Sequence, residues 1–112
     1  VNILTSYVIG RPPNNQSSYI VSKYSLLGLS KSLSVELGSY GITVNSVSPS
    51  MTNTNLIEKL PLKLKEIIAN NVPVGRLADP NDITSAVLFL CSKNSSYISG
   101  ENILVSAGET MH

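Results

Sequence analysis

Short apolar segments with the character of β-strands alternate along this chain with helical segments, and this order constrains the fold most. Strands are predicted at residues 1–7, 42–47 and 102–105, where Val, Ile and Leu are frequent. Helices are predicted over 17–37 and, as one or two short pieces, over 52–71. Apolar strands that alternate with helices predict a parallel sheet covered on both faces.

A third helical segment has the local signals of a helix start. Asp79 is the predicted N-cap, Pro80 occupies the first helical position, and Asp82 lies near the positive end of the helix dipole. The apolar residues that follow recur at helical spacing and form one stripe: Ile83, Ala86, Val87 and Leu90. This helix is therefore expected to pack one face against the sheet.

Three strands are few for a sheet of this type, because an apolar edge would be left unpaired. We therefore expect an α/β fold in which residues 1–112 are the C-terminal part of a doubly wound parallel-sheet (Rossmann-like) domain. The glycine-rich turn that binds dinucleotide phosphates in such domains is not found in this sequence. We expect that turn in an N-terminal half outside these residues.

The composition indicates a globular protein and disfavours several partners. Hydrophobic residues make up 42% of the chain and charged residues 13%, with a formal net charge of +1. The sequence contains no cluster of Lys and Arg of the kind that binds nucleic acid or anionic membrane surfaces. No apolar run approaches the ~20 residues that span a bilayer. We expect neither nucleic acid nor a membrane as a partner.

Cys91 is the single cysteine, so an intrachain disulfide is ruled out. Its apolar neighbours at 88–90 predict a buried and unreactive thiol. A reduced thiol fits a cytosol-like compartment, and the predicted location is cytoplasmic.

The helix predicted over 17–37 carries two apolar stripes on opposite sides. One stripe comprises Tyr19, Lys23, Leu26, Leu33 and Leu37, and the other comprises Ile20, Tyr24, Leu27, Lys31 and Val35, with Gly28 beside it. Two apolar stripes indicate two buried faces, one against the sheet and one against another helix of the same chain or of a partner subunit. We favour the subunit interface, and expect a homodimer or homotetramer formed through residues 19–37.

Ser6, Tyr19 and Lys23 form a pattern with chemical meaning. Ser6 is expected at the end of the first strand, while Tyr19 and Lys23 share one face at the start of the next helix. Because ligands bind outside the carboxyl ends of parallel strands, these residues are expected at one rim, which Pro49 also reaches. An ammonium group stabilises a nearby phenolate, and a serine hydroxyl stabilises charge on a carbonyl oxygen. The pattern suits ketone reduction, or alcohol oxidation, with hydride from a cofactor.

A tyrosine four residues before a lysine is a weak signal when taken alone. A core tyrosine beside a lysine that reaches solvent gives the same pattern. A metal mechanism is disfavoured, because the sequence has one histidine, one cysteine and no clustered carboxylates with ligand spacing. The case for catalysis therefore depends on what surrounds the three residues.

Five ordered blocks surround them, at residues 1–6, 19–37, 41–49, 73–83 and 96–105. These blocks resemble the short-chain dehydrogenase/reductase family, which has a strand ending in the catalytic serine, a Tyr-x-x-x-Lys motif and a proline turn after the next strand. They are similar to its 3-oxoacyl-carrier-protein reductase-like members. The resemblance covers essentially the whole chain and implies an oxidoreductase that uses NAD or NADP.

The resemblance also implies roles at matching positions. Tyr19 would be the general acid/base, Lys23 would tune it and hydrogen-bond the nicotinamide ribose, and Ser6 would orient the substrate carbonyl. The residues implied to contact the cofactor are Tyr19, Lys23, Pro49, Ser50, Thr52 and Thr54. The stretch 54–71 would be a mobile lid over the substrate.

The sequence departs from the family pattern in two places. Ser50 follows the proline where the family usually has glycine, a change expected to narrow the approach to the cofactor. The last strand continues into Ser106-Ala107-Gly108 where the family usually has Asp-Gly-Gly. Neither change touches the three catalytic positions. The active-site asparagine of the family also lies outside this chain.

The substrate and the activity have alternatives. Tyr7, Val8 and the lid residue Leu56 predict a mixed polar and apolar pocket for a carbonyl or alcohol substrate. A carrier-linked 3-oxoacyl group, a small ketone and a sugar-type carbonyl are all compatible with it. The alternatives to a reductase are a catalytically silent fragment or interaction module, and an extended relative such as an epimerase or dehydratase. We expect residues 1–112 alone to be inactive.

Overall fold

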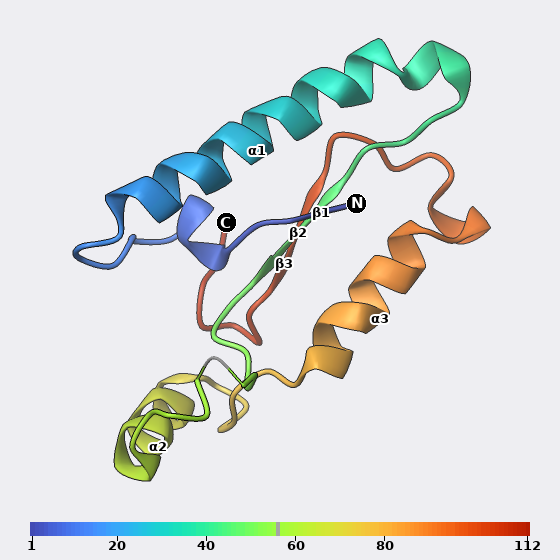
Figure 1. The fold of residues 1–112 in the computed structure, drawn as a ribbon. Helices are drawn as coiled ribbons and strands as arrows, with labels where there is room; N and C mark the ends of the chain where they lie inside the picture. Colours follow the sequence, from blue (N-terminus) through green and yellow to red (C-terminus); the bar gives the residue numbers. More distant parts are fainter. Residues whose placement is uncertain (56) are drawn as a thin grey trace.

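The computed structural model describes residues 1–55 and 57–112, in which a small parallel sheet lies between two helices (Figure 1). The strands are β1 (Asn2–Ile3), β2 (Ser46–Pro49) and β3 (Asn102–Val105), in the spatial order β1-β2-β3. Both pairings are parallel, and Ser46 lies opposite both Asn2 and Asn102. The predicted α/β class with a three-stranded parallel sheet is confirmed.

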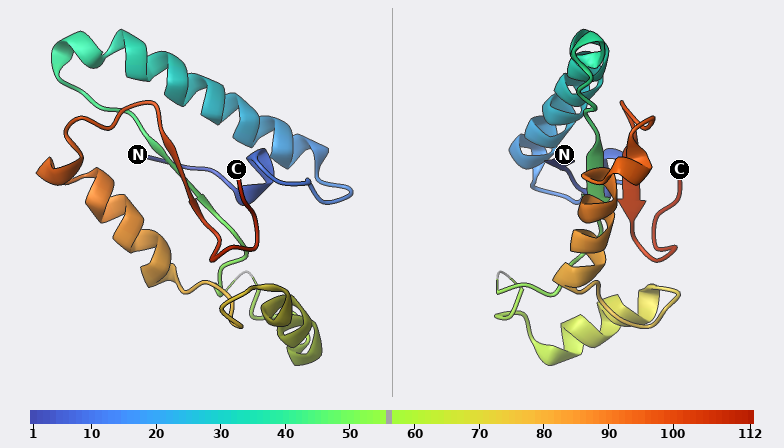
Figure 2. Two further views of the ribbon diagram at one scale, coloured as in Figure 1. Left: turned by 180° about the vertical axis from the view of Figure 1, so that it is seen from behind. Right: turned by 90° about the vertical axis from the view of Figure 1, so that its right-hand side faces the viewer.

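The helices α1 (Ser17–Glu36) and α3 (Pro80–Leu90) cover opposite faces of this sheet, and α2 (Leu62–Asn71) projects from one end (Figures 1 and 2). On the α1 side, Asn2 Nδ2 of β1 donates a hydrogen bond to Ser30 Oγ at 2.8 Å. On the other side, α3 packs along β2 and β3. Helices on both faces are the arrangement of a doubly wound sheet. Within the described residues, no helix has the length and apolar character needed to cross a membrane.

The start of α3 confirms the local prediction. Asp79 Oδ1 accepts a hydrogen bond from Asn81 N at 2.9 Å, and Asp82 Oδ2 accepts one from Asp79 N at 2.7 Å. Asp79 and Asp82 form a capping box, in which each side chain bonds to the main chain of the other residue, and Pro80 is at the first helical position. The helix then turns Leu90 into the core, where it is 4% exposed.

The first predicted strand, residues 1–7, is too long. Leu4 N still donates to Val47 O at 2.8 Å, but Ser6–Val8 form a 3₁₀ turn. Thr5 ends the extended segment because its hydroxyl accepts a hydrogen bond from Tyr7 N at 3.5 Å and so caps the turn. Ser6 is therefore held in a turn just after β1 and not at the end of a long strand.

The second predicted strand is shifted: residues 42–47 were expected, and β2 begins at Ser46 and includes Pro49. Just before it, Asn45 O accepts a hydrogen bond from Asn2 N of β1 at 2.9 Å, but Val44 and Asn45 otherwise bond to a distant loop. Val44 O accepts from Gly100 N at 2.8 Å, and the Asn45 amide bonds both Ile98 O and Glu101 N. These partners lie more than 50 residues away in the sequence, so the local pattern does not reveal them.

The prediction that Cys91 is buried is wrong, because its thiol is exposed. Cys91 is the C-cap of α3, one residue past Leu90. Leu90 takes the inward position in this turn, which leaves the following side chain on the outer side of the helix. A single apolar run at 88–90 does not say which of its members faces the core.

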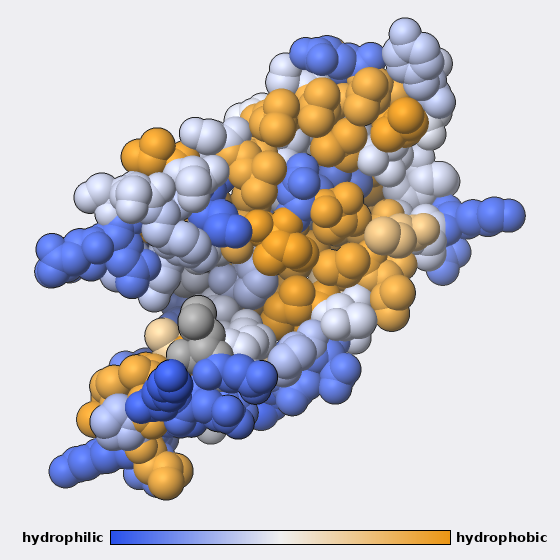
Figure 3. Space-filling model, viewed as in Figure 1, coloured by the Kyte–Doolittle hydropathy of each residue, from blue (hydrophilic) through white to orange (hydrophobic). Residues whose placement is uncertain are grey.

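Apolar side chains also lie on the surface. Figure 3 shows them gathered from α1 across the open β1 edge of the sheet towards α3. Ile3 lies in β1, the strand at this open edge of the sheet, and is 43% exposed. The buried apolar residues are few by comparison: Leu4, Val8, Val44, Val47, Val72 and Leu90.

Candidate active site

A pocket of about 540 Å³ opens at the carboxyl end of β1 and β2, next to the N-terminus of α1. It is lined by Leu4, Thr5, Ser6, Tyr7, Gln16, Tyr19, Pro49, Ser50, Met51, Thr52, Thr54 and Ile57. The carboxyl edge of a parallel sheet is where such folds bind their ligands. Among the described lining residues there is no charged side chain, so the pocket suits a neutral substrate group.

The backbone around Ser6 is fixed by local hydrogen bonds. Ser6 O accepts from Ile9 N at 3.0 Å and from Gly10 N at 2.9 Å. The residue is 5% exposed, and its hydroxyl makes no hydrogen bond to another described residue. A fixed backbone with an uncommitted hydroxyl is suited to bind a ligand atom in the pocket.

Tyr19 and Lys23 lie in the first two turns of α1, as the spacing predicts. Lys23 Nζ is 5.7 Å from the centroid of the Tyr19 ring, close enough for a cation–π interaction. Nζ also donates a hydrogen bond to Ile3 O at 2.9 Å. This bond joins α1 to the strand that precedes Ser6, so it helps to set the distance between the tyrosine and the serine.

The segment after β2 forms the opposite wall of the pocket. Ser50 N donates to Val105 O at 3.0 Å, which continues the ladder one residue beyond Pro49. Thr52 Oγ1 donates to Ser50 O at 3.0 Å, and Thr52 also pairs with Ala78 in an isolated parallel bridge. The segment is therefore anchored to β3 on one side and to the chain before α3 on the other.

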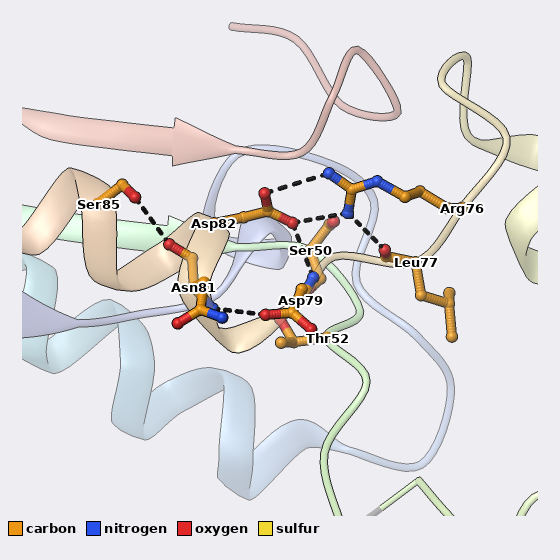
Figure 4. Close-up of polar contacts among 8 residues, drawn as sticks. All are labelled: Ser50, Thr52, Arg76, Leu77, Asp79, Asn81, Asp82 and Ser85. Atoms are coloured by element: carbon orange, nitrogen blue, oxygen red, sulfur yellow. Dashed lines mark hydrogen bonds and ion pairs between the residues drawn. The ribbon is translucent and has the colours of Figure 1, made fainter.

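An ion pair holds the chain between α2 and α3 (Figure 4). Arg76 Nη1 donates to Asp82 Oδ2 at 2.7 Å, and Arg76 Nη2 donates to Asp82 Oδ1 at 3.2 Å. The Arg76 hydrogen bond, followed by that from Asp79 N, lowers the pKa of Asp82 to about 2. The same contact raises the pKa of the Arg76 guanidinium. The pair joins the chain that follows α2 to the first turn of α3.

Most of the predicted site residues meet in this pocket. Ser6, Tyr7, Tyr19, Pro49, Ser50, Thr52 and Thr54 line it. Lys23 lies beside Tyr19 and is not among the lining residues, and Val8 is 7% exposed and points into the core. Leu56 lies outside the described residues.

Sequence reasoning missed Leu4, Thr5, Gln16 and Met51 among the lining residues, whereas Ile57 belongs to the stretch 54–71 that was predicted to be the lid. Leu4 and Thr5 were assigned to the interior of a strand, so the turn at Ser6–Val8 hid their position. Gln16 had a signal that was available, since it lies three residues before Tyr19 and neighbours it at helical spacing. Met51 had none, because the direction of the chain after Pro49 is not encoded locally.

Comparisons with known proteins agree with this fold. The family model described as enoyl-(acyl carrier protein) reductase matches residues 1–110. The chain is 40% identical to the 3-oxoacyl-(acyl-carrier-protein) reductase FabG of Rickettsia prowazekii and 42% identical to that of Rickettsia bellii, over 93% of this chain and 42% of each relative. It is 38% identical to the mouse (3R)-3-hydroxyacyl-CoA dehydrogenase, over 92% of this chain and 40% of that protein.

The structure is that of an α/β protein with a pocket at the carboxyl edge of its parallel sheet. The match over nearly the whole chain makes the assignment more specific: this chain belongs to the short-chain dehydrogenase/reductase family. It spans about two fifths of the length of the curated relatives that it matches, 42% for the Rickettsia prowazekii protein.

Proposed function

We propose that the complete protein is an oxidoreductase that interconverts a ketone and an alcohol by hydride transfer with NAD or NADP. One observation carries this proposal: Ser6 and Tyr19 line the same uncharged pocket, and Lys23 Nζ is 5.7 Å from the Tyr19 ring centroid. Family membership supports it, as do the names of the relatives, a reductase and a dehydrogenase of acyl groups. Residues 1–112 form the C-terminal half of its dinucleotide-binding and catalytic domain.

The donors at the pocket fit the nicotinamide end of such a cofactor. Pro49, Ser50, Thr52 and Thr54 line the pocket, and the Lys23 ammonium lies 5.7 Å from the ring centroid of Tyr19, which also lines it. The Thr54 hydroxyl and the Lys23 ammonium can donate to the amide and ribose oxygens of the nicotinamide nucleoside, whereas the Thr52 hydroxyl already donates to Ser50 O. The bound cofactor supplies the hydride that reduces the carbonyl carbon. The turn that holds its phosphates belongs to the proposed N-terminal half.

Side chains of this chain carry out the proton transfer that accompanies hydride transfer. In the reduction direction, the Tyr19 phenol gives its proton to the carbonyl oxygen, and in oxidation the phenolate takes the proton from the alcohol. Ser6 Oγ–H donates a hydrogen bond to the same oxygen as negative charge develops on it. The Lys23 ammonium stabilises the phenolate that Tyr19 forms when it has given up its proton.

The substrate class is a small carbonyl or alcohol compound, including carrier-linked 3-oxoacyl groups. Tyr7 lines the pocket and would contact it directly. Val8 and Leu56 were predicted as further contacts, and the buried position of Val8 makes it a support behind the pocket wall. The pocket also offers the apolar surface of Leu4, Met51 and Ile57 to a short acyl chain.

The test is the oxidation of NADH or NADPH by the complete gene product that contains residues 1–112, with a panel of ketones, 3-oxoacyl thioesters and sugar carbonyls. We expect turnover with at least one member of the panel and a loss of about 10²–10⁴-fold in kcat for Tyr19→Phe. Tyr24→Phe is the matched control, because Tyr24 lies on the same helix, is 48% exposed and does not line the pocket. Equal rates for Tyr19→Phe and wild type would refute the mechanism.

A catalytically silent interaction module is the second candidate, and the apolar surface along α1 and the β1 edge favours it. The same assay separates the two candidates. A complete gene product that oxidises neither nucleotide with any carbonyl supports the silent module. We also expect isolated residues 1–112 to bind NAD(P)H weakly, because the proposed phosphate-binding half is not included in them.

A further inference from the structure

The side of α1 that faces the sheet is anchored by a polar contact. Among the residues of α1, all of which the structure describes, Ser30 alone is buried, at 2% exposed. Ser30 Oγ donates a hydrogen bond to Leu26 O at 2.7 Å and accepts one from Asn2 Nδ2 of β1 at 2.8 Å. Because the hydroxyl proton is used within the helix, Ser30 serves the strand as an acceptor. The contact therefore has a defined direction, from β1 to α1.

The strand side of this contact is fixed in the sheet. Asn2 N donates to Asn45 O at 2.9 Å, and the Asn45 side chain is bonded to the loop at 98–101. Ser46, the register partner of Asn2, is fully buried, and its hydroxyl has no hydrogen-bond partner among the described residues. The Asn2 amide thus bonds to the helix and not to the neighbouring hydroxyl in the sheet. The bond joins the two layers of the fold.

A second bond joins α1 to β1, but its two groups have other uses. Lys23 Nζ donates to Ile3 O at 2.9 Å. Asn2 N and Leu4 N both bond on the β2 side, so Ile3 O between them faces the open edge, where the N-terminal half is expected. In the proposed reaction the Lys23 ammonium also serves the cofactor. The Asn2–Ser30 bond is the one that lies inside the fold.

This bond is placed to control the geometry of the pocket. Tyr19 precedes Ser30 by eleven residues, about 16 Å along the helix axis, and no proline interrupts α1, so the helix is expected to move as a unit. Ser6 follows Asn2 closely in the chain. Apolar contacts are not directional, whereas a hydrogen bond fixes a distance and an angle. The bond therefore limits sliding of α1 along β1.

We propose that Asn2 is a positioning residue, whose hydrogen bond to Ser30 sets the place of α1 along β1 and so holds Tyr19 at the correct distance from Ser6. This inference rests on the proposed function and adds to it a residue that is not among the described residues lining the pocket. A displacement of about 1 Å at reacting groups can slow a reaction about 10²-fold. The loss is therefore expected in the chemical step and not in binding.

The test is a single turnover of NADH or NADPH bound to the complete gene product, with the carbonyl of the panel that wild type reduces fastest. The rate constant reports the chemical step, and the amplitude reports the fraction of protein that is folded and active. For Asn2→Ala and for Ser30→Ala we expect a rate constant about 10- to 100-fold below wild type with an unchanged amplitude. Ser30→Ala should fold readily, because alanine is the best helix former.

Two further variants show whether the bond itself is responsible. Ser46→Ala is the matched control, because Ser46 lies opposite Asn2, is fully buried and has no side-chain partner among the described residues. Its rate constant should stay within about twofold of wild type. The double variant Asn2→Ala/Ser30→Ala should be slower than the slower single variant by no more than about threefold, since both changes remove the same bond.

The opposite outcomes are equally clear. A wild-type rate constant with a reduced amplitude would make Asn2 a residue that serves folding alone, and an unchanged rate constant and amplitude would remove it from the account. Losses that multiply in the double variant, or an equal loss in Ser46→Ala, would mean that the bond is not the cause. Each result contradicts the inference and leaves the oxidoreductase intact. If wild type turns over no carbonyl of the panel, the proposed function fails, and this inference fails with it.

Discussion

Gly10 lies between Ser6 and the C-terminal turn of the chain. Its N–H donates to Ser6 O at 2.9 Å, and a Cβ placed on it would lie 3.0 Å from Thr110 Cγ2. Thr110 is itself held, because Ser106 Oγ donates to Thr110 O at 2.8 Å. The absence of a side chain at Gly10 thus lets the C-terminal segment pack against the turn that carries Ser6.

Gly10→Ala tests this contact. We expect a loss of about 1 kcal/mol in the free energy of unfolding, because the added methyl forces Thr110 to shift. Gly38→Ala is the control, since a Cβ there meets no atom within 4 Å, and it should stay within about 0.5 kcal/mol of wild type. Urea unfolding followed by circular dichroism measures both variants. Identical unfolding midpoints for the two variants would mean that Thr110 moves aside with no loss of stability, which would contradict the prediction.

At the scale of single residues, the sequence predicted which residues line the pocket better than it predicted the hydrogen bonds that hold them. Ser6 and Tyr19 were placed at one rim from strand and helix phase, and both line the same pocket. The hydrogen bond from Lys23 Nζ to Ile3 O was not predicted, because it links residues 20 positions apart. Their catalytic roles stay predictions until activity is measured.

Between elements, the Arg76–Asp82 pair connects the chain after α2 to the first turn of α3. The Asp82 carboxylate has two tasks, since it binds Arg76 and also accepts the N–H of Asp79 in the capping box. Both partners are partly in solvent, so the pair is screened by salt. It acts mainly to fix the direction in which the chain enters α3.

The lowered pKa of Asp82 predicts a pH dependence of stability. The pKa is about 2 in the folded chain and about 3.8 without the contacts, so the stabilisation is full above pH ~4 and is lost as the pH falls through ~2. Asp82→Asn cannot titrate there. We expect the unfolding midpoint in urea to fall more steeply from pH 4 to pH 2 for wild type than for Asp82→Asn, and the difference to shrink at 1 M salt. Parallel curves for the two proteins would contradict the assignment.

Element boundaries were predicted correctly where neighbouring residues determine them. The cap of α3 was predicted correctly because Asp79, Pro80 and Asp82 form it within four residues. The start of β2 was not, because Val44 and Asn45 are held by residues 98–101 on the other side of the chain. Strand limits depend on which distant backbone groups are available, and that information is spread over the whole fold.

The described structure is less compact than a single domain of this length usually is. Its radius of gyration is 15.1 Å, against roughly 13 Å for a compact domain of this size. Apolar side chains remain exposed on the outer side of α1, where Val21, Tyr24 and Val35 are 64%, 48% and 82% exposed. Gly28 lies on the same side and leaves room for close helix packing. We propose that the β1 edge pairs with the N-terminal half and that this side of α1 contacts a second subunit.

The subunit contact is tested by placing charge on α1. We expect the double variant Val21→Glu/Val35→Glu of the complete gene product to dissociate into monomers, because a buried carboxylate pair is costly at an apolar interface. Its unfolding midpoint in the monomeric state should change little. Lys63→Glu changes the net charge by the same two units at an exposed position on α2, which projects from one end of the fold, and should leave the assembly intact. Light scattering after size-exclusion chromatography gives the mass. A double variant with the wild-type mass would exclude this side of α1 from the interface.

The central claim is that hydride reaches a carbonyl carbon in the pocket while Tyr19 handles the proton. The most direct measurement supplies NAD(P)H deuterated at nicotinamide C4 to the complete gene product with a 3-oxoacyl thioester. The account predicts an alcohol with deuterium on its C3 carbon, formed about 10²–10⁴-fold more slowly by Tyr19→Phe than by wild type or Tyr24→Phe. Product without deuterium at that carbon, or formed equally fast by Tyr19→Phe, would contradict it.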